Sequence, residues 1–591
     1  MLSQYRTLLV SVCLAFASLT FASHAADENV VSGEQGTKYL VARSKALSYD
    51  FVGAAELFRE LIRQSSKDLH LLATSLPIFI VEGDLESAME TASEIEELDE
   101  DDLLSDIVLL AADLSAGDYE KALIRSTSLE AFIGPDLPEV VRGWVYVGMN
   151  DMASAEDSFG TEIAQGAQEL LSFHRALALA TTGDFESAEN LMGEIAGRDQ
   201  VPRSIPDQLI TAWAQALVQL DKRDEALQLM RSFGHERVPD HVAEGLNDLD
   251  RRIEAGDQVD FDFVTGPATG VAAFFLSVAR DLAIDGDERL QAAIIFVRLA
   301  EILDPDNPII AHTLGEYFGN LGSYESAIAS LDTIDENDPA HFLAEIEAAQ
   351  WLRSSGQIDE SFRRLDAVKS QYGDKVRVHL AIGNGRLNDN AYDLAEIAFD
   401  RAHQLTLARA PENPGDEQYQ AYFEGNWYPL FSRAIARERL GEWERAKSDL
   451  ELAAEYSEGH PYVMNYLGYS MLIQGEDSQL AEQYIAMAVA AEPDNGAFID
   501  SLGWAYFLQG RYEEALPLLE RAVRLLPNTA EVIDHLGDVY WKVGRKREAI
   551  FQWKRALLFE DEYVDADRVE RKIDIGLDRV LEEEAAANDP N

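Results

Sequence analysis

The chain has 591 residues, of which 47% are hydrophobic, and its formal net charge is −58 at pH 7. This apolar content supports a folded core and excludes a disordered chain. The charge argues against nucleic acid or anionic lipid as a partner, because both repel an acidic protein. Two interpretations of the charge stay open: solubility of a large exposed surface, and attraction of basic partners.

The first 25 residues are predicted to be a signal peptide. Arg6 supplies a short positive region, an apolar stretch follows at 8–16, and "SHA" at 23–25 is a small-x-small cleavage site. An uncleaved membrane anchor is the alternative, because the apolar stretch has an intermediate length. Cleavage would remove Cys13, the single cysteine of the chain, and so exclude disulfides and thiolate chemistry. We therefore expect an exported, periplasmic protein, free or associated with the inner or outer membrane.

A repeat of 34 residues runs through the rest of the chain. It is clearest in "IDSLGWAYFLQGRYEEALPLLERAVRLLPN" at 499–528 and "IDHLGDVYWKVGRKREAIFQWKRAL" at 533–557, where Gly503 and Gly537 occupy the same position. This is the tetratricopeptide (TPR) pattern, in which small residues let two helices approach closely and a proline ends the second helix. The small residue of the second helix recurs along the chain at Ala54, Ala88, Ala122, Ala155, Ala188, Ala226, Ala293, Ala327, Ser361, Ala395, Ala446, Ala481, Ala515 and Ala549.

Irregular steps in this series divide the chain. Most steps are 33–35 residues long, but a step of 67 follows Ala226 and a step of 51 follows Ala395. The first predicts a degenerate repeat with a linker, and the second predicts an exposed inserted loop rich in proline, glycine and acids. We therefore expect an N-terminal TPR arm at 35–236, the degenerate repeat and linker at 237–273, a middle TPR block at 274–409, the inserted loop at 410–426 and a C-terminal TPR block at 427–563.

The last segment, 564–591, is predicted to be a capping helix with an acidic tail. Val569, Ile573, Leu577 and Val580 share one face of that helix, and a terminal repeat needs such a cover because no further repeat follows it. The predicted fold class is thus all-α: a tetratricopeptide-repeat superhelical solenoid of about fourteen helix-turn-helix repeats with a C-terminal capping helix.

Seven residues form a candidate peptide-binding groove. Positions 5 and 9 of each first helix share one face and line the concave side of this fold. In the last three repeats, with one tryptophan that extends the wall, they are Asn465, Tyr469, Asp500, Trp504, Asp534, Asp538 and Trp541. Acids and aromatic rings predict a basic or apolar peptide as the ligand. The alternative is that the tryptophans pack between repeats and the aspartates pair locally.

No catalytic or metal-binding motif is found. The string "GNGRLN" at 383–388 is predicted to be packing, because Gly383 occupies the small position of a first helix and no strand precedes it. His235 and His241 lack the i, i+4 spacing that would place two ligands on one helix face. We therefore predict no enzymatic activity, no cofactor and no metal.

The C-terminal repeats resemble a known family. "YVMNYLGYSMLIQGE" at 462–476, the two stretches quoted above, "FSRAIARERLGEWERAKSDLELA" at 431–453 and "AGDYEKAL" at 116–123 resemble exported tetratricopeptide-repeat proteins of alphaproteobacteria. The resemblance implies a non-catalytic scaffold of the cell envelope that binds a protein or peptide, in the first place another envelope protein. Relatives that clamp peptide carboxylates carry lysine and asparagine at the groove positions, so the resemblance does not extend to that clamp. The alternative function is a membrane-anchored accessory of polysaccharide or lipopolysaccharide synthesis and export.

Overall fold

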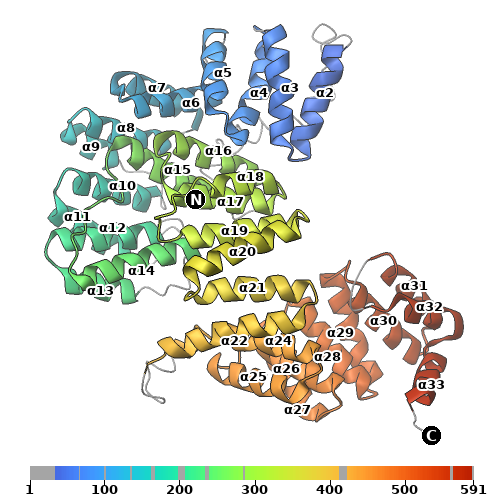
Figure 1. Ribbon diagram of the computed structural model, residues 1–591. Coiled ribbons are helices and arrows are strands. Elements are labelled where there is room, and N and C mark those ends of the chain that lie inside the picture. Colours follow the sequence, from blue (N-terminus) through green and yellow to red (C-terminus); the bar gives the residue numbers. More distant parts are fainter. Residues whose placement is uncertain are drawn as a thin grey trace. The chain divides into compact units, whose positions relative to one another are not determined.

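The fold was analysed in a computed structural model, which describes residues 34–65, 67–98, 102–133, 136–160, 167–197, 206–232, 239–283, 287–411, 422–559 and 564–588. These residues form helices joined by short connections (Figure 1), and they include no β-strand. The all-α, helical-repeat fold class is therefore confirmed. The predicted signal peptide at 1–25 lies outside the described residues.

The chain divides into two units, residues 1–370 and 371–591. The first contains α2 (Glu34–Leu47), α3 (Phe51–Gln64), α4 (Leu69–Glu82), α5 (Leu85–Leu98), α6 (Leu103–Ala116), α7 (Tyr119–Ile133), α8 (Asp136–Gly148), α9 (Met152–Phe159), α10 (Ala167–Thr181), α11 (Phe185–Ala196), α12 (Pro206–Gln219), α13 (Arg223–Ser232), α14 (Asp240–Ala255), α15 (Pro267–Ala283), α16 (Asp287–Leu303), α17 (Pro308–Asn320), α18 (Tyr324–Leu331), α19 (His341–Ser354) and most of α20 (Ile358–Tyr372).

The second unit contains α21 (Val376–Asn388), α22 (Tyr392–Arg409), α24 (Tyr428–Arg439), α25 (Trp443–Tyr456), α26 (Pro461–Ile473), α27 (Ser478–Ala491), α28 (Gly496–Leu508), α29 (Tyr512–Leu525), α30 (Ala530–Lys542), α31 (Lys546–Ala556), α32 (Ala566–Ile575) and α33 (Leu577–Asn588). Across the described residues of both units, no helix is long and apolar enough to cross a membrane.

The helix pairs pack through the small residues that define the repeat. All thirteen alanines of the series are 0% exposed and Ser361 is 2% exposed, so the predicted register holds from the first pair to the last. A Cβ atom added at Gly503 would lie 2.7 Å from Cγ of Leu519 on the second helix, which shows why the first helix needs glycine there. A Cβ at Gly383 would meet the ring of Phe399, so "GNGRLN" serves packing, as expected.

Turn chemistry fixes where each pair bends. Gly510 and Gly544 lie between the paired helices with φ of 75° and 85°, a left-handed conformation that glycine adopts without a steric penalty. Aspartates at several of these turns start the second helix, because their carboxylates accept hydrogen bonds from backbone N–H groups of the first turn. Asp50 caps α3 in this way, and Asp184 caps α11.

The pair α15–α16 folds back onto the N-terminal arm, a contact that the sequence did not predict. α16 packs against α4 and α6, and α15 packs against α8 and α10 (Figure 1). Nε of Arg298 on α16 donates to the carbonyl of Val81 at 3.4 Å. On the other helix, Gly270 lies directly against the Trp144 ring of α8, with no room for a Cβ atom. The first-helix face of the N-terminal arm is therefore filled by the chain's own helices.

The predicted degenerate repeat and linker at 237–273 consists of α14, a non-helical segment at 256–266 and the start of α15. The segment is attached to α12 by Gln215, whose side-chain oxygen accepts from the backbone N–H groups of Asp262 and Phe263 at 3.1 and 3.0 Å. This segment is the connection that allows the chain to reverse and place α15 against α8.

The prediction of one capping helix is wrong, because the segment forms two helices. Gly576, with φ 86° and ψ 150°, breaks the helix between α32 and α33, since this backbone conformation is one that other residues rarely adopt. Val569, Leu577 and Val580 are buried as expected, and Ile573 is partly buried. The capping segment thus covers the last repeat with two short helices that also pack on each other.

The inserted loop predicted at 410–426 lies largely outside the described residues, which resume at 422. Its end belongs to the core of the second unit. Phe423 is 1% exposed and stacks on Tyr456, with ring centroids 4.2 Å apart. The hydroxyl of Tyr422 donates to the carbonyl of Thr406 at 2.8 Å, which ties this end of the insertion to α22.

Candidate functional site

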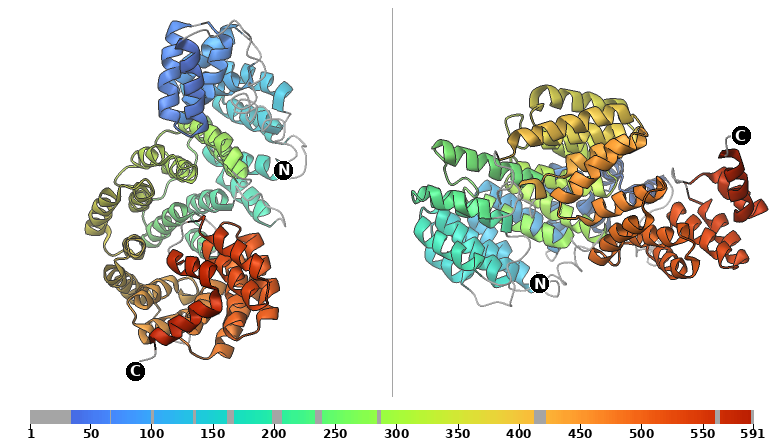
Figure 2. Two further views of the ribbon diagram at one scale, coloured as in Figure 1. Left: turned by 90° about the vertical axis from the view of Figure 1, so that its right-hand side faces the viewer. Right: turned by 90° about the horizontal axis from the view of Figure 1, so that it is seen from below.

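The seven predicted groove residues lie on three first helices of the second unit. They are Asn465 and Tyr469 on α26, Asp500 and Trp504 on α28, and Asp534, Asp538 and Trp541 on α30. α28 packs against both α26 and α30, so the three helices form one row, coloured orange to red in Figure 2. The predicted residues are thus brought to adjacent helices, and their contacts differ along the row.

Two of the aspartates share a buried lysine from the capping segment. Nζ of Lys572 on α32 lies 2.7 Å from Oδ2 of Asp534 and 2.8 and 2.9 Å from the two carboxylate oxygens of Asp538. The lysine side chain is completely buried. Asp538 also accepts from Nε1 of Trp553 at 2.9 Å. This end of the row is therefore closed by an internal ion-pair cluster.

The charge state of Asp538 reflects its burial. Burial raises the pKa of Asp538 to about 6, Lys572 acts in the opposite direction, and the neighbouring Asp534 carboxylate adds to the increase. Lys572 has two carboxylates within hydrogen-bond distance. When both carboxylates are ionised, they carry two negative charges against the single positive charge of Lys572. Protonation of Asp538 removes that excess.

The third aspartate has a cationic partner on the next helix. Oδ2 of Asp500 lies 3.0 Å from Nδ1 of His535 on α30, and both side chains are buried. Burial alone would lower the pKa of His535, but the Asp500 carboxylate outweighs it and the pKa is raised to about 9. Protonated His535 therefore pairs with Asp500 at neutral pH.

Trp504 packs around the same histidine. Its ring stacks on the His535 ring with centroids 3.8 Å apart and planes 14° apart, and it also stacks on Phe507 at 4.5 Å. An imidazolium lying on an indole face gains cation–π attraction, which stabilises the protonated form further. Trp504 is half-buried, so part of its ring still reaches the surface.

The remaining residues lie at the two ends of the row. The hydroxyl of Tyr469 donates to Oε1 of Glu531 at 3.1 Å, and burial, followed by the Glu531 charge, raises the pKa of this hydroxyl. Asn465 is half-buried, and its buried Oδ1 has no hydrogen-bond partner. At the other end, Nε1 of Trp541 donates to Asp578 of α33 at 2.9 Å.

All three aspartates therefore have internal cationic partners, which is the arrangement that the local-pairing alternative predicts. His535 and Lys572 offset two of the three negative charges expected of the groove. The surface left at this row is mainly aromatic and amide in nature, contributed by Tyr469, Trp504 and Asn465. Such a surface suits an apolar segment with free backbone hydrogen-bonding groups better than a basic one.

The sequence reasoning missed both cationic partners. Lys572 follows Val569 by three residues, so it lies on the inward face of α32, and a lysine on that face signals a buried acid opposite. His535 follows Asp500 by 35 residues, about one repeat, which places them on adjacent first helices. Both signals were present in the sequence, but they require the repeat register to be applied to polar residues as well as to apolar ones.

A third set of polar residues gathers in the first unit. His241 on α14, His312 on α17 and Glu347 on α19 offer one ligand atom each within 4.8 Å of one another. His235, the other histidine considered from the sequence, lies outside the described residues. The spacing of this cluster along the chain matches no metal-binding motif, so the sequence predicted no metal there.

Comparison with known proteins supports the repeat assignment. Residues 503–544 match a family model described as TPR repeat. Over 181 residues the chain is 25% identical to the TPR repeat-containing protein PA4667 of Pseudomonas aeruginosa, a match that covers 31% of this chain and 28% of that protein. The chain thus spans under a third of the length of this curated relative.

Two solved structures are similar to the chain at low sequence identity. The APC/C hetero-tetramer Cut9-Hcn1 matches with 14% identity and a TM-score of 0.37, covering 96% of this chain and 99% of that one. A tetratricopeptide repeat protein from Parabacteroides merdae matches with 14% identity and a TM-score of 0.35, covering 45% and 97%. The family model and the curated relative together support a TPR-repeat protein.

Proposed function

We propose that the chain is a non-catalytic scaffold of the bacterial cell envelope that binds another protein through the first-helix row of its C-terminal unit. TPR repeats serve as protein-binding surfaces, and the family model and the relative both support such repeats here. The exported location rests on the predicted signal peptide, with its cleavage site at 23–25.

One observation favours the C-terminal row over the N-terminal arm. In the arm, the pair α15–α16 packs on α4, α6, α8 and α10 and occupies their first-helix face. In the C-terminal unit, α26 packs on α25, α27 and α28. Its neighbour α28 packs on α26, α27, α29 and α30. All of these contacts lie within one repeat or between adjacent repeats. The row therefore offers the surface on which a partner can bind without displacing a helix of the chain.

The proposed contact is an apolar peptide segment laid across α26 and α28. The rings of Tyr469 and Trp504 supply contact area at a small cost in conformational entropy. The half-buried Asn465 lies one helical turn before Tyr469, and its amide group adds hydrogen-bonding capacity next to the ring. Asp500, Asp534 and Asp538 shape the row through their internal ion pairs rather than by contacting the ligand.

The test compares one double variant and one single variant of the full exported chain. Capture from the envelope fraction identifies a partner, and peptides from that partner are then titrated against Tyr469→Ala/Trp504→Ala and against Phe551→Ala. Phe551 is 64% exposed on α31, a second helix, so it controls for loss of an exposed aromatic ring. We expect the double variant to weaken binding by tenfold or more, since aromatic hot spots contribute about 2 kcal/mol or more each. Equal affinity in the two variants would refute the assignment.

The location is tested separately by mass spectrometry of the mature N-terminus after cell fractionation. An N-terminus at Ala26 in the soluble periplasm supports the scaffold as proposed. An intact N-terminus in the membrane fraction would instead favour the membrane-anchored accessory of polysaccharide or lipopolysaccharide export.

A further inference from the structure

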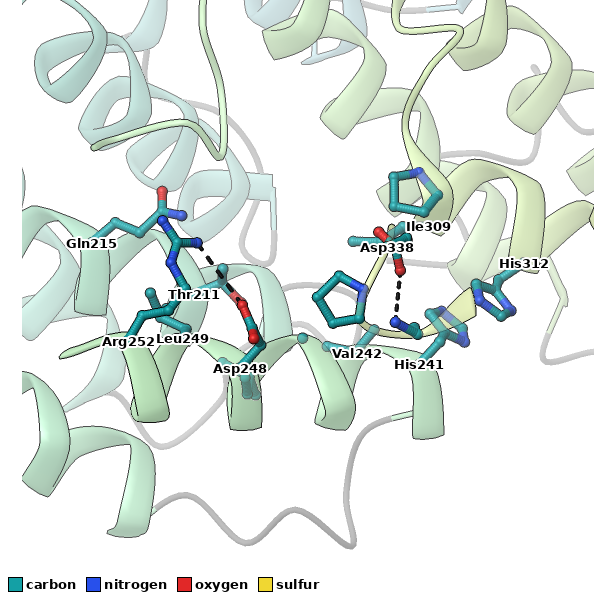
Figure 3. A pocket seen from close by; sticks show the side chains of 15 residues that line it. Thr211, Gln215, His241, Val242, Asp248, Leu249, Arg252, Ile309, His312 and Asp338 are labelled. Carbon is teal, nitrogen blue, oxygen red and sulfur yellow. Dashed lines mark hydrogen bonds and ion pairs between the residues drawn. The ribbon is translucent and has the colours of Figure 1, made fainter. Parts of the chain in front are cut away.

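A cavity of about 210 Å³ in the first unit is bordered by a pair of buried histidines. It lies among α12, α14, α17 and the segment at 338–340, and Figure 3 shows the rings of His241 and His312 next to each other at one end. The two rings are parallel within 3° and their centroids are 4.4 Å apart. Both side chains are more than nine-tenths buried.

The histidines have unused ligand capacity. Nε2 of His241 and Nε2 of His312 are both buried without a hydrogen-bond partner among the described residues. Leaving a polar nitrogen buried and unsatisfied in this way is unfavourable. A single ion cannot use both nitrogens of one imidazole, so the His312 nitrogen that can share an ion with Glu347 is Nδ1, while His241 has Nε2 free.

Glu347 supplies a carboxylate to the same place. Its Oε2 lies 3.3 Å from Nδ1 of His312, and one ligand atom from each of His241, His312 and Glu347 lies within 4.8 Å of the others. In a tetrahedral zinc site with bonds of about 2.0–2.1 Å, ligand atoms are about 3.3 Å apart.

We propose that His241, His312 and Glu347 bind one divalent transition-metal ion, with Zn²⁺ as the best match. Two imidazoles and one carboxylate are ligands that zinc accepts, whereas calcium and magnesium prefer oxygen alone. Three protein ligands leave a fourth position open for a water molecule. The ion would join α14, α17 and α19 and so stabilise the part of the first unit where the repeat is least regular.

The test uses the full exported chain, without a histidine tag and stripped of metal by chelation. Equilibrium dialysis against Zn²⁺, read by elemental mass spectrometry, is compared for the wild type and for His241→Gln, His312→Gln and Glu347→Gln. His174→Gln is the matched control, because His174 is also fully buried in the first unit with an unpartnered Nε2 but lies beside Trp144 rather than a carboxylate. Far-UV circular dichroism confirms that each variant is folded.

We expect one Zn²⁺ per wild-type chain and per His174→Gln chain, and a tenfold or greater loss of affinity in each ligand variant. Zn²⁺ should also raise the melting temperature of the wild type but not that of the ligand variants, since a ligand that binds the native state stabilises it. Absence of stoichiometric Zn²⁺ binding by the wild type, or binding that the three ligand variants retain, would overturn the proposal. Neither result depends on the protein partner, so the proposed scaffold function is tested independently.

Discussion

Replacing Lys572 with methionine removes the cation that two buried carboxylates share. Methionine keeps an unbranched apolar stem but leaves Asp534 and Asp538 without the ammonium group that lies 2.7–2.9 Å from their oxygens. Removing one partner of a buried ion pair costs about 3–5 kcal/mol, because the remaining charge stays desolvated. We expect a loss of this size in the free energy of local unfolding of α30 and α32 at pH 8.

The loss should depend on pH, because Asp538 can take up a proton. Its folded pKa of about 6 exceeds the ordinary value of 3.8, so the stability linked to Asp538 is fully present below pH 3.8 and is lost as the pH rises through 6. Without Lys572, which lowers this pKa, the folded pKa rises further and protonation stabilises the variant more. The deficit of the variant is therefore expected to be smaller at pH 5 than at pH 8.

Hydrogen exchange of the full chain, followed by mass spectrometry, measures this effect locally. A loss of about 3 kcal/mol corresponds to more than hundredfold faster exchange in peptides from 530–542 and 566–575. Lys554→Met, at an exposed position on α31, removes the same charge without exposing a buried acid and is expected to exchange like the wild type. Unchanged exchange in Lys572→Met, or an equal deficit at both pH values, would refute the reasoning.

Two further predictions concern other contacts. Asp500→Asn should lower the melting temperature more at pH 6 than at pH 10. The Asp500 carboxylate raises the pKa of His535 to about 9, so the stability that this pair contributes is fully present below pH 6.5 and is lost as the pH rises through 9. Calorimetry that gives equal losses at both pH values would contradict this prediction. Gly270→Ala should cost about 1–3 kcal/mol by forcing a methyl group into the Trp144 ring. It should also speed proteolysis at 256–266, whereas Gly245→Ala, where an added Cβ meets nothing within 4 Å, should not.

The helix pairs could be predicted because their contacts are local and periodic. Ala515 packs within its own repeat, and Ala549 does the same one period later, so a single rule places every small residue of the series. The break at Gly576 was also visible in principle, since glycine inside an otherwise amphipathic helix is a candidate for a helix break.

The return of α15–α16 could not be predicted in this way. Arg298 and Val81 are 217 residues apart, and nothing in a 34-residue period relates them. The sequence does hold an indirect signal: α4, α15 and α16 are apolar around most of their circumference, which indicates helices covered on more than one side. That signal shows that a cover exists but not which segment provides it.

The candidate sites also depend partly on local periodic patterns and partly on contacts between distant residues. The repeat register placed the seven groove residues on adjacent first helices, but their partners depend on polar pairs between helices. His312 and Glu347 are 35 residues apart, about one repeat, but His241 joins them from α14, in the irregular part of the chain, so no local motif marks the cluster. Short-range patterns therefore locate the helices, while the chemistry arises from contacts between distant segments.

The return of α15–α16 has a consequence for the order in which the chain folds. During synthesis, α4 and α6 emerge long before residues 267–303, which cover them in the native state. Until that length is reached, the apolar faces of these helices stay exposed, and contacts of such long range form slowly. A product truncated before Pro267 would hence leave its first helices open to aggregation, whereas the C-terminal repeats complete their core as each neighbour is added.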